Sequence, residues 1–214
     1  MLTLTPGAVT LSQLRELWSG ARARLSDDAL AAIDTAASAV ERIVASGKTV
    51  YGINTGFGLL AQTRIPAAQL ADLQRNLILS HSCGLGAPLP RNTVRMMIIL
   101  KLIGLGRGHS GVRREVIDAL QSLLDADAMP LIPSQGSVGA SGDLAPLAHM
   151  VAALMGEGRI DLAGEIMPAA DALQKMGREL LDLAPKEGLA LINGTGPSGS
   201  KSRHPGRATA RPTS

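Results

Sequence analysis

The chain has 214 residues, which allows one domain, or one domain with a small annex. Its composition, 45% hydrophobic and 18% charged, excludes a wholly disordered, collagen-like or low-complexity protein. Only Trp18, Tyr51 and Phe57 are aromatic, so the core must be built from aliphatic side chains, a mixture that favours packed helices.

The net charge of +3 comes from the end of the chain. Residues 196–214 hold four basic residues and no acidic one, whereas residues 1–195 hold 17 basic and 18 acidic residues. The body is therefore nearly neutral, which argues against nucleic acid as a partner. The single cysteine, Cys83, cannot form an internal disulfide and fits a cytoplasmic location. We expect no membrane partner, because no apolar run reaches about 20 residues and Lys101 interrupts the longest, residues 96–105. We also expect no signal peptide, because the N-terminus lacks a basic region followed by an apolar one.

In the first half of the chain, helix signals alternate with glycine-rich breaks. A capping box formed by Thr10 and Gln13 opens a short helix, and Ser26 caps a longer one that Gly47 ends. Residues 48–53 suggest a short strand, followed by a glycine-broken loop over residues 51–58. Two further helices open at prolines and extend over residues 66–84 and from residue 90 to the glycines that begin at 104.

The second half is predicted to contain four more helices and one hairpin. Residues 129–143 are predicted to be an ordered loop, and residues 159–167 a small hairpin. The helix over residues 144–155 is almost wholly apolar, so it should be buried on all sides. The other predicted helices span residues 112–124, 169–183 and 187–192. These patterns together predict a mainly α fold.

One loop of small residues carries unusual chemical potential. In Gly139-Ala140-Ser141-Gly142-Asp143, a hard bend would bring the amide nitrogen of Gly142 to the carbonyl carbon of Ala140, and a side chain at 142 would obstruct that bend. Loss of water closes a five-membered ring, and loss of the Ser141 hydroxyl as a second water leaves an exocyclic methylene. The product is a methylidene-imidazolone, an electrophile that no ordinary side chain supplies. On this loop alone, however, a helix N-terminus capped by Asp143 is the more common explanation.

A longer motif around this loop favours the chemical interpretation. Residues 136–149, GSVGASGDLAPLAH, resemble the signature of the histidine, phenylalanine and tyrosine ammonia-lyase family. Three further segments resemble the family in order: YGINTGFG at 51–58, NLILSHSCG at 76–84 and EGLALINGT at 187–195. The resemblance covers nearly all of residues 1–195. It implies the N-terminal globular helical domain of the ammonia-lyase fold, mainly α with a few short strands and without the long central helical bundle.

The resemblance also implies a reaction and a self-made prosthetic group. Ala140, Ser141 and Gly142 would form the methylidene-imidazolone, with no external cofactor. The Ser80-His81 pair is the one carried by members that act on histidine, which implies L-histidine as substrate and trans-urocanate and ammonia as products, the first step of histidine degradation. Members that act on tyrosine or phenylalanine usually carry another pair, and they stay the alternative within the family. Intact members are homotetramers.

The remaining roles concern three side chains, each with an ordinary structural alternative. The resemblance implies that Tyr51 removes the β-proton of the substrate, that His81 faces the substrate imidazole and that Asn193 hydrogen-bonds near the ring. Without it, Tyr51 would be a turn residue with a surface hydroxyl, His81 a partner of the helix C-terminus, and Asn193 a helix cap. A serine hydrolase using Ser141 is a weaker hypothesis. The Gly-x-Ser-x-Gly motif of such enzymes would need glycine at position 143, where this chain has Asp143. The four histidines and one cysteine show no metal-ligand spacing.

The resemblance stops at Thr195. We therefore expect an incomplete ammonia-lyase domain over residues 1–195, followed by a disordered basic tail over 196–214 that has the composition of a shifted reading frame. Family members are more than twice as long and bury apolar faces of this part under their helical bundle. We expect the helix over 144–155 to lose part of its packing here, and the chain alone to have little or no lyase activity. A non-catalytic remnant is the alternative from another functional class.

Overall fold

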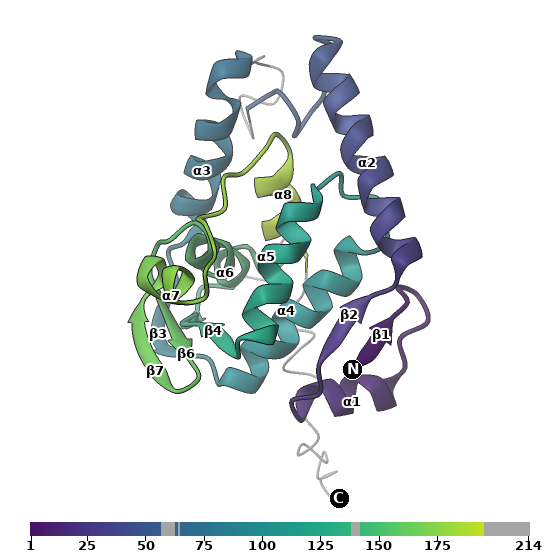
Figure 1. Ribbon diagram of the computed structural model, residues 1–214. Helices are drawn as coiled ribbons and strands as arrows, with labels where there is room; N and C mark the ends of the chain where they lie inside the picture. The colour runs from purple at the N-terminus through teal and green to yellow at the C-terminus, as the bar shows by residue number, and fades with distance from the viewer. Residues whose placement is uncertain (57–62, 64, 138–141, 195–214) are drawn as a thin grey trace, which may run out of the picture.

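The computed structural model describes residues 1–56, 63, 65–137 and 142–194. The predicted tail over 196–214 lies outside these residues, as do Ala140 and Ser141. The prediction of a mainly α fold with a few short strands is confirmed (Figure 1). The helices are α1 (Leu11–Trp18), α2 (Asp27–Ala45), η2 (Ala67–Gln69), α3 (Leu70–His81), α4 (Arg91–Leu105), α5 (Arg114–Asp125), α6 (Leu144–Leu154), α7 (Ala169–Lys175) and α8 (Glu187–Ile192).

The strands are short and form three small sheets. The first pairs β1 (Leu2–Leu4) with β2 (Ala23–Leu25) in parallel, and the second pairs β3 (Leu85–Pro88) with β5 (Pro133–Gln135) in antiparallel fashion. The third is an antiparallel sheet of β4 (Ala128–Pro130), β6 (Arg159–Leu162) and β7 (Glu165–Pro168). The last two of these strands are the predicted hairpin.

The core is aliphatic, as the composition predicts. Helix α4 lies inside the molecule between α1 and α5, and its buried residues include Met97, Ile98 and Leu102. Helix α6 packs against α3, α7 and α8. Figure 1 shows α4 and α5 in the middle of the molecule, with α2 and α3 along its two sides. Among the described residues, no helix is long and apolar enough to cross a membrane.

The local helix signals act as predicted. The side chains of Thr10 and Gln13 form the reciprocal capping box at the start of α1, and Ser26 Oγ accepts a hydrogen bond from Ala29 N at 3.4 Å at the start of α2. Helix α6 is buried almost completely within this chain. The expectation that it loses packing without a helical bundle is therefore wrong, because α3, α7 and α8 cover it.

Three boundary predictions are wrong for identifiable reasons. Residues 48–53 form a turn and not a strand, because the Asn54 side chain bonds the backbone of Val50 at 2.8 Å and of Lys48 at 2.7 Å. The predicted loop over 129–143 contains the end of β4 and all of β5, whose partners β6 and β3 are distant in sequence. The helix predicted over 169–183 ends at Lys175, since Gly177 adopts φ +66° and the following segment bonds back to the end of α6.

Candidate active site

The predicted ring-forming segment meets a distant part of the chain. Gly142 and Gly194 form an isolated parallel β-bridge, and Asp143 N donates to Gly194 O at 2.8 Å. The N-terminus of α6 is thus joined directly to the residues that follow α8. This contact brings two of the predicted site positions, Gly142 and Asn193, to one place.

Position 142 accepts only glycine in this arrangement. Its φ is +107°, which L side chains rarely adopt, and a β-carbon there would lie 2.6 Å from Gly194 O. From the sequence, we predicted that a side chain at position 142 would obstruct the bend of the loop. In the structure, such a side chain would collide with the backbone of Gly194.

Residues 137 and 143, which flank the segment over 138–141, are joined by a side-chain hydrogen bond. Ser137, which is exposed, donates through Oγ to Oδ1 of Asp143, which is 1% exposed. Asp143 is the N-cap residue of α6, as the structural alternative predicts, but its side chain makes no capping hydrogen bond to the helix. Its carboxylate instead connects the residues on the two sides of the ring-forming segment.

Lys101 is a further residue of this region. It comes from α4, is 9% exposed, and its ammonium donates to Asn193 O at 2.8 Å and to Ala190 O at 3.3 Å. Burial lowers the pKa of Lys101 to about 8. We predicted no role for Lys101 from the sequence. Its position within an otherwise apolar run was the one indication that it could have a role.

Asn193 occupies the C-cap position of α8, as its structural alternative predicts. Its backbone N–H donates to Leu189 O at 3.1 Å, and its backbone carbonyl accepts from the Lys101 ammonium. The residue is exposed. The residue therefore reaches the ring-forming segment through its backbone and through Gly194.

Tyr51 lies on a turn that packs against α8. Its side chain is 58% exposed. A β-carbon on the neighbouring Gly52 would lie 2.7 Å from Leu189 Cδ2, so the turn approaches the helix closely. The buried polar residues Asn54 and Thr55 hold the turn through hydrogen bonds to its backbone. Tyr51 and Asn193 are thereby attached to the same short helix.

His81 ends α3, which packs against both α6 and α8. Its Nδ1 lies 2.8 Å from Leu77 O and 3.2 Å from Ser80 Oγ. A carbonyl oxygen only accepts, so Nδ1 carries the proton, and Nε2 of the neutral ring is the acceptor. The bond to Leu77 is the helix contact that the structural alternative predicts, and it fixes the tautomer that any ligand would meet.

His149 connects α6 to the segment that follows α3. Its Nε2 accepts a hydrogen bond from Gly84 N at 3.0 Å, which requires a neutral ring. Burial lowers the pKa of His149 below its usual 6.5. Among the residues that the structure describes, no group of three His, Cys, Asp or Glu side chains is arranged to hold a metal ion.

The His149 contact predicts a pH dependence of stability. As the pH falls below 6.5, the unfolded chain binds a proton more readily than the folded chain, so the free energy of unfolding decreases. His149→Gln removes this titration and should flatten the profile measured by urea unfolding between pH 7 and 5. His109→Gln, at an exposed histidine, is the control and should keep the wild-type slope. Equal slopes in the two variants would contradict the assignment.

Comparison with known proteins identifies relatives over most of the chain. The family model described as aromatic amino acid lyase matches residues 9–201. A histidine ammonia-lyase of Enterobacter sp. (strain 638) is 58% identical over 195 residues, which are 91% of this chain and 38% of that protein. The crystal structure of histidine ammonia-lyase from Trypanosoma cruzi has a TM-score of 0.86 and 39% identity, over 95% of this chain and 39% of that one.

The same fold occurs in a solved structure that is named for a different substrate. Ergothionase, an ergothioneine-degrading enzyme of Treponema denticola, gives a TM-score of 0.90 at 29% identity, over 94% of this chain and 41% of that one. The chain spans less than two fifths of the length of the curated relatives described above.

Proposed function

The chain belongs to the aromatic amino acid lyase family. We propose that it is the part of an ammonia-lyase that carries the ring-forming segment. We also propose that L-histidine is the substrate of the complete enzyme. The observation that carries this proposal is the Gly142–Gly194 bridge, which leaves no room for a side chain at the position whose nitrogen must attack. Identity of 56–58% to relatives named histidine ammonia-lyase favours histidine, as does the Ser80-His81 pair.

The described residues fit a self-made methylidene-imidazolone. The Ser137–Asp143 hydrogen bond and the Gly142–Gly194 bridge hold the residues on either side of Ala140 and Ser141 in place. Ring closure needs the Gly142 nitrogen to bond the Ala140 carbonyl carbon, with its oxygen leaving as water. The Ser141 hydroxyl and α-hydrogen then leave as a second water. When formed, the group supplies an electrophilic methylene carbon for an amine.

The other site residues would handle the substrate. The Tyr51 phenolate oxygen, as a base, would take the proton from the substrate β-carbon and become the hydroxyl. His81 presents a defined tautomer, with Nε2 as an acceptor for the N–H of an imidazole. Asn193 would hydrogen-bond beside the ring-forming segment. The complete enzyme would be a cytoplasmic homotetramer, and residues 1–195 would form one incomplete domain of it.

Intact-mass measurement of the purified chain tests the ring. We expect the wild-type chain to lack the mass of two water molecules relative to its sequence, and fragment mapping to place the loss within residues 138–143. Ser141→Ala has no hydroxyl to eliminate, so it should not show that double loss. A wild-type chain with an unmodified Ser141 would mean that this chain is a non-catalytic remnant.

Activity of the chain by itself is a separate prediction. We expect little or no urocanate from L-histidine, because the chain spans 38% of the Enterobacter relative and lacks the groups that the remainder supplies. An absorbance assay for urocanate on the purified chain measures this directly. Substantial turnover would show that residues 1–214 hold a complete site.

A further inference from the structure

Lys101 is a buried cation whose partners are backbone carbonyls. It makes hydrogen bonds to Asn193 O and Ala190 O, and none of the ion pairs among the described residues includes it. Burying an ammonium without a carboxylate is unfavourable. Its neighbours on α4, Leu100 and Leu102, are apolar, and an apolar side chain of similar length would avoid this penalty. The lysine therefore needs an explanation beyond packing.

The two carbonyls identify what the ammonium holds. Ala190 and Asn193 lie at the C-terminal end of α8, where helix carbonyls lack partners within the helix and carry partial negative charge. A β-carbon on Gly194 would lie 3.6 Å from Lys101 Nζ, so the ammonium sits beside the next residue too. Lys101 thus fixes both the end of α8 and the segment that leaves it.

That segment is the one in contact with the ring-forming loop. Gly194 follows the clamped carbonyl of Asn193, pairs with Gly142 and accepts the hydrogen bond from Asp143 N at 2.8 Å. A continuous series of contacts therefore runs from the ammonium through Asn193 and Gly194 to the residue whose nitrogen would close the ring.

We propose that Lys101 is a positioning residue for ring closure, holding Asn193 and Gly194 against Gly142 so that the Gly142 nitrogen stays in place for its attack. This inference rests on the proposed function for its chemical consequence. Its structural part, that Lys101 fixes the Gly142–Gly194 contact, stands on hydrogen bonds within this chain.

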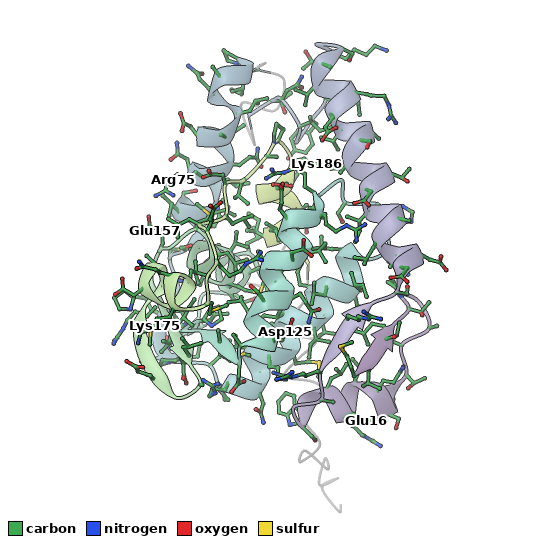
Figure 2. All side chains as sticks on the ribbon, in the orientation of Figure 1. Glu16, Arg75, Asp125, Glu157, Lys175 and Lys186 are labelled. Carbon is green, nitrogen blue, oxygen red and sulfur yellow. The ribbon has the colours of Figure 1, made fainter. Side chains whose placement is uncertain are left out.

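Two substitutions at position 101 test the role. Lys101→Met removes the donors and the buried charge together, whereas Lys101→Gln keeps N–H donors without the charge. Lys175→Met is the matched control, since Lys175 is an exposed lysine that pairs with Glu165 at the surface of the molecule (Figure 2). The midpoint temperature of thermal unfolding, measured for every variant, establishes that the variant is folded at the temperature of the experiments below.

Hydrogen exchange reads the contact itself. In Lys101→Met, we expect the Asp143 amide to exchange at least tenfold faster than in the wild-type chain, with the Leu120 amide of α5 unchanged. Lys101→Gln should give an intermediate rate and Lys175→Met the wild-type rate. If the Asp143 rate is unchanged in both Lys101 variants, or if all amides accelerate equally, the positioning role is overturned.

Intact mass reads the consequence. The dehydrated fraction should fall at least fivefold in Lys101→Met, partly recover in Lys101→Gln and stay at the wild-type level in Lys175→Met. Full dehydration of Lys101→Met would overturn the proposal. An undehydrated wild-type chain would count against the proposed function, whereas the exchange rate at Asp143 would still decide whether Lys101 fixes the contact.

Discussion

Replacing Glu187 with alanine is expected to lower the free energy of unfolding by about 2–4 kcal/mol, because it removes a fully buried carboxylate that accepts four hydrogen bonds. The Glu187 side chain is 0% exposed. Its carboxylate accepts from Arg113 N at 2.9 Å, from Arg113 Nε and Nη2 at 3.0 Å each, and from Ala184 N at 2.7 Å. Alanine would leave the backbone N–H groups of Arg113 and Ala184 without this acceptor, while the partly exposed guanidinium would keep its contacts with Glu115 and Asp182 O.

The electrostatics of the pair support this direction. The hydrogen bond to Glu187 raises the pKa of Arg113 and outweighs the opposing effect of burial, so the guanidinium stays charged in the folded chain. Glu187 also begins α8, so its loss weakens the anchorage of the helix that carries Asn193.

Urea unfolding followed by circular dichroism measures the loss, with Glu157→Ala as the control. Glu157 pairs with Arg75 at 2.6 Å, but both side chains are 47% exposed, and Figure 2 shows the pair at the edge of the molecule. An exposed pair of this kind contributes about 0–1 kcal/mol. If Glu187→Ala is no more destabilising than Glu157→Ala, the buried network does not anchor α8 as described.

The sequence predicted features whose causes are local. Helices α1 and α2 begin where Thr10 and Ser26 supply side-chain caps, and α6 is buried because its run is apolar except for His149. These signals lie within a few residues of the structure that they specify. The strands pair segments that are far apart, such as β1 with β2 and β3 with β5, and three or four residues carry too short a pattern to predict such partners.

The candidate site divides in the same way. The ring-forming triplet was found through a motif of consecutive residues. The bridge from Gly142 to Gly194 was not predicted, because it depends on how α6 and α8 pack. Lys101 appeared in the sequence only as a charge within an apolar helix, and its carbonyl partners lie on another element. Charges that interrupt apolar helices therefore merit attention when a reactive loop is present elsewhere in the chain.

Dehydration of the ring-forming segment and turnover of substrate are expected to depend on different parts of the protein. Helix α6 is covered by α3, α7 and α8 of this chain, so the N-terminus that carries the ring-forming segment has a packed support. In the proposed function, ring closure would involve atoms of residues 140–142 and the contacts that hold them. Substrate turnover would also involve groups from the part of the longer relatives that this chain does not span. The two reactions should therefore separate in this chain, with dehydration present and turnover absent.

Gly142→Ala provides the sharpest test of that support, and we expect it to abolish dehydration of the segment. A β-carbon at this position would meet Gly194 O at 2.6 Å, a separation that forces the two backbones apart and breaks the Asp143–Gly194 hydrogen bond. The φ of +107° adds backbone strain for any L side chain. Strain and the lost hydrogen bond together should lower the free energy of unfolding by about 2–4 kcal/mol.

Gly177→Ala separates the contact from the strain. Gly177 also has a positive φ, +66°, but a β-carbon there meets nothing within 4 Å. This variant should lose about 1–2 kcal/mol from strain and keep full dehydration in the intact mass. Dehydration of Gly142→Ala at the wild-type level would show that the approach of Gly194 is not what bends the segment. Loss confined to Gly142→Ala would mean that glycine is required there by a contact between distant segments, in addition to the chemistry of its own nitrogen.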